Sequence, residues 1–293
     1  MKYFYSLILL LCLIIACDVD QNIKEKPSAE SSSTRVVTLS PHLGEMMFEL
    51  EAGDMVVGVS AFSKYPEAIL TKPLIGDAFM LDLEQISLLR PDIILAWEDG
   101  TPPRIIDELR DLNYRVEVIR SSRLQDIPLA LELIGSLIGK QAQASLVANT
   151  YLKELTELKE VYGNKDSIRV FFQIDERPLF TVGGSHYISE LIHACGGVNI
   201  FNDLSQLAPS VSVESVIIGD PEVILTSASL KDKNKFEIWL RWPDISANQL
   251  QNLYAIEADG LERPTTNLIK AALEICQHLE ESRSKRIGPH ALD

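Results

Sequence analysis

The sequence has few positive charges. Lysine and arginine together number 27, against 42 aspartates and glutamates, so the formal net charge is −15. This imbalance argues against nucleic acid and anionic lipid surfaces as partners, because both carry negative charge themselves. It permits docking on a basic protein surface, and it also keeps a protein soluble without any partner.

Close-spaced histidines are missing. The five histidines are His42, His186, His193, His278 and His290. His186 and His193 share one face of a predicted helix but lie two turns apart, which is too far for one metal ion. His42 follows the first predicted strand, where we expect a solvated loop histidine. The sequence therefore predicts no metal site and no metal-ion receptor.

The motifs of common enzymes are missing as well. Gly183-Gly184-Ser185 precedes a predicted helix, as a phosphate-binding turn does, but it lacks the Lys-Ser/Thr of a P-loop. We expect Ser185 to cap that helix instead. No Gly-x-Ser-x-Gly elbow and no Cys-His nucleophile pattern occurs. The sequence favours a binding protein over an enzyme, and it predicts no cofactor.

A long apolar run occurs at the N-terminus. Met1-Lys2 is followed by apolar residues up to Ile15, which are too few for the ~20 of a membrane span. Ile14 to Cys17 resembles a bacterial lipobox, and Asp18 resembles the signal that keeps lipoproteins at the inner membrane in enteric-type bacteria. We therefore predict a signal peptide over 1–16 and lipid on Cys17. A plain anchor helix with a buried cysteine is the alternative.

The polar residues that follow, with Pro27 and a serine run, are typical of a flexible tether up to Thr34. The chain is then exported and held at the membrane on the periplasmic or outer side. Cysteine is scarce in the rest of the chain: only Cys195 and Cys276 remain. Two cysteines in an exported chain predict one disulfide, and two buried thiols are the alternative.

One segment of the chain occurs twice. Residues 82–95 and 212–225 align without a gap. In each copy an N-cap residue opens a short helix, and an acidic residue, Glu84 or Glu214, follows in the first turn. A proline then ends the helix before a buried strand. Such a recurrence indicates two duplicated lobes.

Strand-like segments alternate with helical ones along the first of the two predicted lobes. The strands are predicted at 35–39, 56–59, 93–95 and 116–119. This alternation predicts an α/β fold in which helices cover both faces of a parallel sheet, as in a Rossmann-like lobe. We expect an N-terminal lobe over 35–124, a linking helix over 125–163 that Gly139 divides, and a C-terminal lobe over 164–293. A long linking helix is stiff and opposes wide hinge closure.

Six stretches spread over both lobes carry a family resemblance. They are Arg35–Pro41, Val57–Pro66, Leu83–Ile86, Arg90–Trp97, Cys195–Phe201 and Leu261–Pro264. Together they are similar to the helical-backbone (cluster A-II) periplasmic binding proteins of ABC importers, and within these to the vitamin B12-binding branch. The resemblance implies a substrate-binding lipoprotein that captures a corrinoid, cobalamin or cobinamide, in a cleft between its lobes and delivers it to a permease. A ferric siderophore or haem is the alternative ligand.

The resemblance also implies which residues contact the ligand. The candidates are Phe62, Tyr65, Phe79, Trp97, Phe180, Asp259 and Arg263. Aromatic rings suit a planar macrocycle, and the last two residues are expected to hydrogen-bond its amide side chains. Five of these residues have a structural alternative: Phe62, Trp97 and Phe180 as core packing, and Asp259 with Arg263 as a local ion pair.

Two departures from the B12-binding pattern stand at Ala78 and Ala208, where characterised members carry tryptophan. We expect the ring of the neighbouring Phe79 to compensate for the first loss. The resemblance further implies that Glu84 and Glu214 receive arginines from the two permease subunits. A matched pair of acidic residues suits a two-fold transporter.

Overall fold

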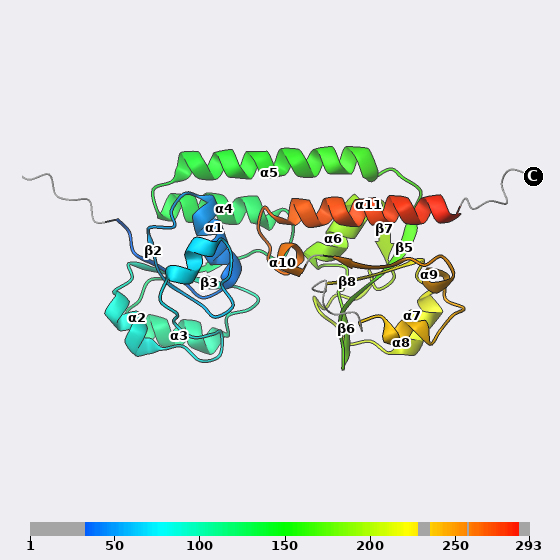
Figure 1. Cartoon of the computed structure of the whole chain (residues 1–293). Coiled ribbons are helices and arrows are strands. Elements are labelled where there is room, and N and C mark those ends of the chain that lie inside the picture. Colours follow the sequence, from blue (N-terminus) through cyan, green and yellow to red (C-terminus); the bar gives the residue numbers. More distant parts are fainter. Residues whose placement is uncertain (1–32, 228–234, 257, 287–293) are drawn as a thin grey trace, which may run out of the picture. The chain divides into compact units, whose positions relative to one another are not determined.

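The computed structural model in Figure 1 describes residues 33–227, 235–256 and 258–286. The predicted signal peptide, Cys17 and most of the predicted tether lie outside these residues. From Thr34 onward the described residues belong to one compact unit. None of the helices in the described ranges is both long and apolar enough to cross a membrane.

The first sheet has four parallel strands in the order β2-β1-β3-β4. Its elements are β1 (Val36–Thr38), α1 (Pro41–Glu49), β2 (Val56–Val59), η1 (Glu67–Thr71), α2 (Leu83–Leu89), β3 (Ile93–Trp97), α3 (Pro103–Asp111) and β4 (Val116–Ile119). The central strands β1 and β3 are buried over nearly their whole length, as their runs of valine and isoleucine predict.

The second sheet repeats this order as β7-β5-β8-β9 and adds the antiparallel edge strand β6, which the sequence did not predict. Its strands are β5 (Ile168–Glu176), β6 (Leu179–Thr181), β7 (Gly197–Asn199), β8 (Val223–Ser227) and β9 (Leu253–Ile256). Its helices are α6 (Tyr187–Ala194), α7 (Val213–Gly219), α8 (Glu237–Leu240), α9 (Ser246–Gln249), α10 (Ala258–Leu261) and α11 (Leu268–Arg286). The prediction of two similar α/β lobes is confirmed.

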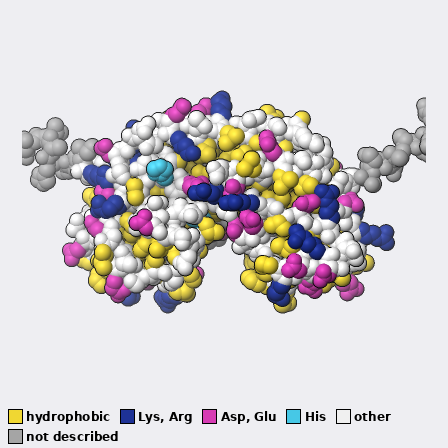
Figure 2. All heavy atoms as spheres, turned by 180° about the vertical axis from the view of Figure 1, so that it is seen from behind, with side chains coloured by type: hydrophobic (Ala, Val, Ile, Leu, Met, Phe, Trp, Pro, Cys, Tyr) yellow, Lys and Arg dark blue, Asp and Glu magenta, His cyan; other side chains and the backbone are white. Residues whose placement is uncertain are grey.

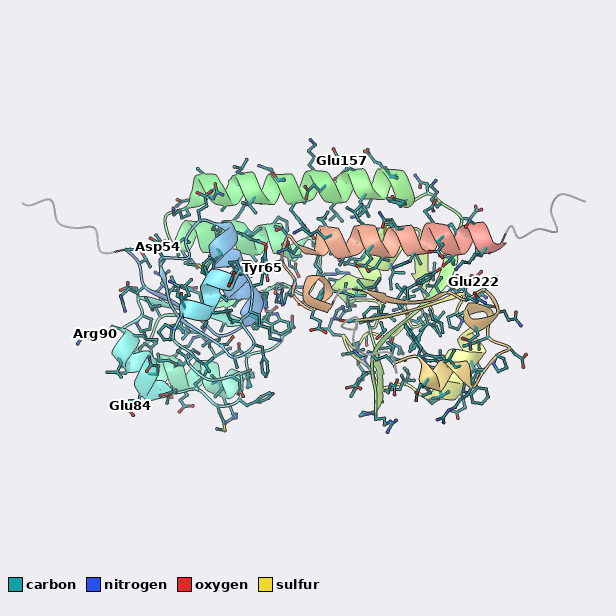
Figure 3. All side chains as sticks on the ribbon, in the orientation of Figure 1. Asp54, Tyr65, Glu84, Arg90, Glu157 and Glu222 are labelled. Carbon is teal, nitrogen blue, oxygen red and sulfur yellow. A yellow bond between two sulfur atoms is a disulfide. The ribbon has the colours of Figure 1, made fainter. Side chains whose placement is uncertain are left out.

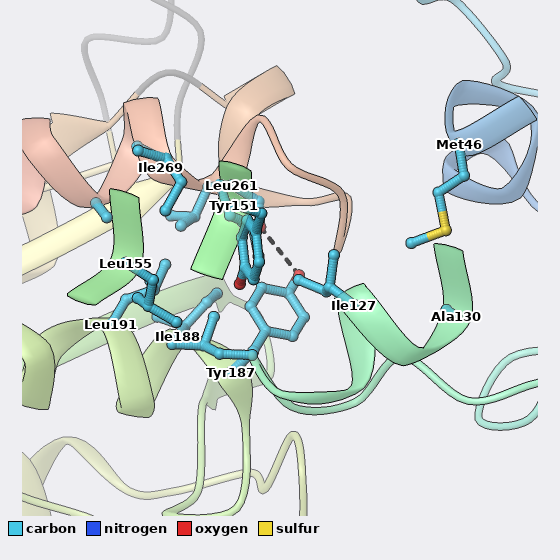
Figure 4. Close-up of a cluster of buried hydrophobic side chains, with 14 of the residues drawn as sticks. Met46, Ile127, Ala130, Tyr151, Leu155, Tyr187, Ile188, Leu191, Leu261 and Ile269 are labelled. Carbon is cyan, nitrogen blue, oxygen red and sulfur yellow. Dashed lines mark hydrogen bonds between the residues drawn. The ribbon is translucent and has the colours of Figure 1, made fainter. Parts of the chain in front are cut away.

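The connection between the sheets is a pair of helices rather than one. α4 (Asp126–Leu137) and α5 (Gln141–Tyr162) are separated at Gly139, whose φ of +74° is left-handed. Figure 1 shows α5 running past both α4 and α11. Side chains of α1, α4, α5, α6 and α11 join one buried cluster, part of which is drawn in Figure 4. A shared core of this kind restricts the motion of one lobe against the other.

The repeated segments fold alike. Asp82 and Ser212 each cap a short helix by accepting a hydrogen bond from the backbone N–H three residues on. Both helices end at a left-handed residue, Arg90 with φ +45° and Asp220 with φ +39°. The two copies therefore share backbone geometry as well as sequence pattern.

The predicted disulfide is present between Cys195 and Cys276. It joins the end of α6 to α11. The guanidinium of Arg283, about two turns further along α11 than Cys276, donates to the carbonyl oxygen of Cys195 at 2.8 Å. The start of the α6–β7 connection is thus fixed by a covalent and a polar contact.

Candidate functional site

A cavity of about 340 Å³ lies between the two lobes. Figure 2 shows the surface hollowed at this boundary. The lobe-one wall contains Trp97, Asp99 and Ser122, and the remaining lining residues are Phe172, Ile174, His186, Tyr187, Ile188, Leu207, Ala208, Ser227, Leu261 and Glu262. The cavity is mainly apolar with a few polar groups, as small-molecule sites usually are.

Trp97 lies at the carboxyl end of β3, and its indole is held from two sides. The ring of His42 meets it edge to face, with centroids 5.0 Å apart. On another side the indole packs on Gly100, where an added Cβ would come within 1.9 Å of the ring. The buried indole N–H has no hydrogen-bond partner in the described part of the chain. A tryptophan fixed in this way offers a preformed surface for a ligand.

The prediction that His42 is a solvated loop residue is wrong. Helix α1 begins at Pro41, so His42 lies in its first turn and is buried. Its two ring nitrogens lie 2.5 Å from the hydroxyl of Ser40 and 3.0 Å from that of Ser121. Burial lowers the pKa of His42 to about 3, and Arg263 adds to this effect. The imidazole is therefore neutral, and it packs edge to face against Trp97.

The cavity also contains polar groups from both lobes. In lobe one the hydroxyl of Ser122 donates to the carboxylate of Asp99. In lobe two the hydroxyl of Ser227 donates to Glu262 at 2.9 Å. Burial lowers the pKa of the His186 imidazole to about 4, against a smaller opposing effect of Asp99. These groups can orient a polar ligand periphery in an otherwise apolar space.

His186, and not Ser185, caps α6. Its Nδ1 accepts a hydrogen bond from the backbone N–H of Ile188 at 3.1 Å. The backbone N–H groups of Gly183 and Gly184 donate to the carbonyl oxygens of Leu207 and Leu204. Since these N–H groups are already used, the glycine pair does not form a phosphate-binding turn.

A second, smaller cavity of about 220 Å³ contains Tyr65 and Arg263, beside residues of α11. Gly260 and Arg263 line this cavity, whereas the two residues between them line the larger one. The segment 260–263 therefore separates two parts of the region between the lobes. Arg263 donates through Nε to Glu45 of α1 at 2.7 Å.

The family of the chain is shown by comparison with known proteins. The periplasmic binding protein family matches residues 36–249. The vitamin B12-binding protein of Vibrio cholerae serotype O1 is 31% identical over 276 residues, which cover 93% of this chain and 98% of that protein. That of Vibrio parahaemolyticus is 30% identical over 253 residues, covering 86% and 91%. This chain belongs to the periplasmic binding proteins.

Solved structures agree with this membership. The periplasmic vitamin B12 binding protein BtuF of Vibrio cholerae has a TM-score of 0.77 at 31% identity, covering 85% of this chain and 97% of that one. The periplasmic haem-binding protein RhuT from Roseiflexus sp. RS-1 has a TM-score of 0.74 at 20% identity, covering 85% and 99%. At that lower identity the second match shows a shared fold alone.

The seven ligand-binding candidates of this periplasmic binding protein do not form a single cluster. Trp97 lines the larger cavity, and Tyr65 and Arg263 line the smaller one. Phe62 and Phe79 are highly exposed and Phe180 is half-buried in β6, and none of the three lines either cavity. The side chain of Asp259, in α10, lies outside what the structure describes. Of the two alanine departures, Ala208 lines the larger cavity.

Sequence reasoning missed the polar lining residues Asp99, His186 and Glu262. A signal existed for two of them. Asp99 comes two places after Trp97, and Glu262 directly precedes Arg263. Both therefore belong to loops at which the family resemblance already pointed. Among the described residues, no group of three or more His, Cys, Asp or Glu side chains is arranged to hold a metal ion.

Glu84 and Glu214 lie on the surface in equivalent positions of α2 and α7. Figure 3 shows Glu84 on the side of the molecule away from Glu157 of α5. One helical turn after each glutamate an aliphatic side chain is exposed, Leu88 at 70% and Ile218 at 85%. Each lobe thus presents the same pair, one acidic and one apolar side chain.

Proposed function

We propose that this periplasmic binding protein serves an ABC importer and captures a corrinoid, cobalamin or cobinamide, between its lobes. The observation that carries the proposal is the cavity whose lobe-one wall contains Trp97, which His42 and Gly100 hold in place. The relatives named vitamin B12-binding proteins match over nearly the whole chain and support the same ligand.

The chemistry of the walls fits such a ligand. A planar macrocycle stacks on the indole, and apolar walls such as Phe172 and Leu261 cover its other faces. The enclosed volume of about 340 Å³ is at the lower end for ligand pockets, so a macrocycle would extend into the hollow between the lobes. Binding of this kind needs no catalytic group, and the relatives are binding proteins rather than enzymes.

Delivery requires a membrane-held protein and a docking surface. We propose residues 1–16 as a lipoprotein signal peptide, Cys17 as the lipidated residue and 17–34 as the tether. The lobes of 35–124 and 164–293 would then dock on the permease through Glu84 and Glu214. The exposed pair of Glu and aliphatic residue in each lobe supports this role, because a two-fold partner would meet the same surface twice.

Calorimetric titration of the chain from residue 18 onward tests the ligand. We expect a dissociation constant at or below about 1 μM for cobalamin or cobinamide, which is roughly −8 kcal/mol. Trp97→Ala should weaken binding at least tenfold, whereas Trp242→Ala, outside both cavities, should not. Heat with haemin or a ferric siderophore, and none with either corrinoid, would replace this proposal with the alternative ligand class.

The lipid anchor has a separate test. Cells grown with labelled palmitate should incorporate label into the wild-type protein and not into Cys17→Ser. The Cys12→Ser variant is the matched control, because that cysteine lies inside the proposed signal peptide. Label that persists in Cys17→Ser would show that Cys17 is not the lipidated residue.

A further inference from the structure

Two carboxylates from opposite lobes line the larger cavity. Asp99 follows β3 in lobe one and accepts from Ser122, and Glu262 follows α10 in lobe two and accepts from Ser227. Each carboxylate is thus oriented by a serine hydroxyl of its own lobe. The arrangement places negative charge on both walls of one mainly apolar space.

No lysine or arginine is among the residues that line this cavity in the described part of the chain. The arginines beside Ser122 are already paired: Arg123 contacts Glu190 at 3.0 Å, and Arg120 contacts Asp126 at 3.3 Å. On the lobe-two side Lys235 donates to the carbonyl oxygen of Ser227 at 2.5 Å, although it does not line the cavity. The described lining therefore contains the two carboxylates and no cation.

The other ionisable lining residues, His186 and Tyr187, add no compensating charge. His186 lines the same cavity, and burial keeps its pKa near 4, so the ring is neutral at neutral pH. Because its Nδ1 accepts from Ile188, the proton of the neutral ring resides on Nε2, which is then a donor. Tyr187 is also neutral, and its hydroxyl donates to the carbonyl oxygen of Leu261. The charge of the lining is thus that of Asp99 and Glu262.

We propose that Asp99 and Glu262 select the ligand by the charge of its periphery: they accept macrocycles bearing carboxamides and reject those bearing carboxylates. The inference rests on the proposed function. It explains how the protein would bind a corrinoid, whose periphery carries amides, and reject haem, which carries two propionates. A primary amide donates N–H groups to a carboxylate, whereas a ligand carboxylate beside Asp99 or Glu262 is repelled. Like charges brought together in a binding site are strongly unfavourable, and more so where water is displaced.

A matched pair of corrinoids tests the charge alone. Cobinamide and cobyrinic acid share the corrin ring, but cobyrinic acid carries carboxylates where cobinamide carries amides. Both are used in their dicyano forms, so that the axial ligands of cobalt are the same. The purified full chain in detergent should prefer dicyanocobinamide by about 100-fold or more at low salt. Each of the two carboxylates then contributes about a tenfold preference in affinity. Higher ionic strength should reduce the preference.

The double variant Asp99→Asn with Glu262→Gln keeps size and polarity but removes both charges. We expect its preference for the amide form to fall at least tenfold, mainly through tighter binding of cobyrinic acid. Glu98→Gln is the control, since this neighbouring carboxylate does not line the cavity. Circular dichroism and a denaturation midpoint confirm that each variant is folded.

The outcomes separate the two proposals. Binding of neither corrinoid by the wild-type chain would overturn the proposed function itself. Tight cobinamide binding with an equal affinity for cobyrinic acid would overturn only the charge selection. The same would follow if the double variant and the wild type showed an unchanged preference.

Discussion

The imidazole of His42 and the indole of Trp97 meet edge to face, with ring centroids 5.0 Å apart and ring planes 82° apart. The hydroxyls of Ser40 and Ser121 each form a hydrogen bond to one nitrogen of the imidazole, and the two bonds fix the orientation of the ring. An edge-to-face pair of this kind contributes about 0.5–1.5 kcal/mol beyond simple burial. The contact therefore couples a buried residue to the wall of the cavity.

His42→Ala should weaken corrinoid binding by roughly tenfold, because the indole of Trp97 is then free to leave its binding orientation. Tryptophan emission, compared in wild-type and Trp97→Phe backgrounds, should shift only where Trp97 is present. His193→Ala, an exposed histidine, is the control and should leave affinity unchanged. Unaltered affinity and emission in His42→Ala would show that His42 does not position Trp97.

The ion pair of Glu45 and Arg263 joins the two lobes and is nearly enclosed, with side-chain exposures of 1% and 13%. Glu45→Gln takes a charged acceptor away from Arg263, Thr265 and Asn267, and breaking a buried ion pair costs about 3–5 kcal/mol. We expect Glu45→Gln to lower the free energy of unfolding by about that amount in a urea titration. Glu117→Gln breaks the exposed pair with Arg115 and should change stability by less than about 1 kcal/mol. Equal losses of unfolding free energy in the two variants would show that the buried pair between the lobes stabilises the fold no more than an exposed pair does.

Glu49 makes stability depend on pH near neutrality. Burial raises its pKa from 4.5 to about 7, against the hydrogen bond from Thr266 and with a further rise from Glu45. The folded state thus binds the proton more tightly than the unfolded chain does. Its stabilising contribution is full below the unfolded pKa and is lost as pH rises through about 7.

Between pH 5 and pH 8 the wild type should therefore lose up to about 3 kcal/mol more unfolding free energy than Glu49→Gln. Urea titrations at both pH values measure the difference. Other titrating groups are common to the two proteins and cancel in the comparison. Parallel pH dependence in the two proteins would exclude Glu49 as the source.

Glu84→Lys combined with Glu214→Lys should abolish transport in an importer reconstituted with its cognate permease. Ligand affinity should stay within about threefold of the wild type, or ~0.7 kcal/mol, because both residues lie outside the cavities. Reversed charges at such an interface chiefly impair encounter and register. Full transport by the double variant would remove the docking role, and a loss of ligand binding would place these residues at the ligand.

The matched control reverses two charges elsewhere. Glu154→Lys with Glu157→Lys alters exposed residues of α5, and Figure 3 shows Glu157 away from Glu84. Transport should continue in this variant. Impaired transport in both double variants would indicate a general effect of net charge rather than docking at α2 and α7.

Much of the fold could be predicted because its signals are local. Strands β2 and β4 have the predicted bounds, and the helix–proline–strand repeat marked both lobes. Pro41 is a further local signal, because proline is favoured at the first position of a helix. This signal predicts that His42 lies in a helix and not in a loop. The edge strand β6 was missed because its three residues become a strand through pairing with β5 and with residues 209–211, not through a local pattern.

The sequence by itself determined the α/β class, the duplication, the disulfide partners and the presence of Trp97 at a strand end. Each depends on neighbours along the chain, or on there being only two cysteines to pair. Only the tertiary structure decided that Arg263 pairs with Glu45 and that Asp99 shares a cavity with Glu262. Those pairs come from opposite lobes, and they are brought together when the segment between α10 and α11 bonds to α1 of lobe one. No local pattern of residues encodes such a contact, because its energy exists only once the lobes share a core.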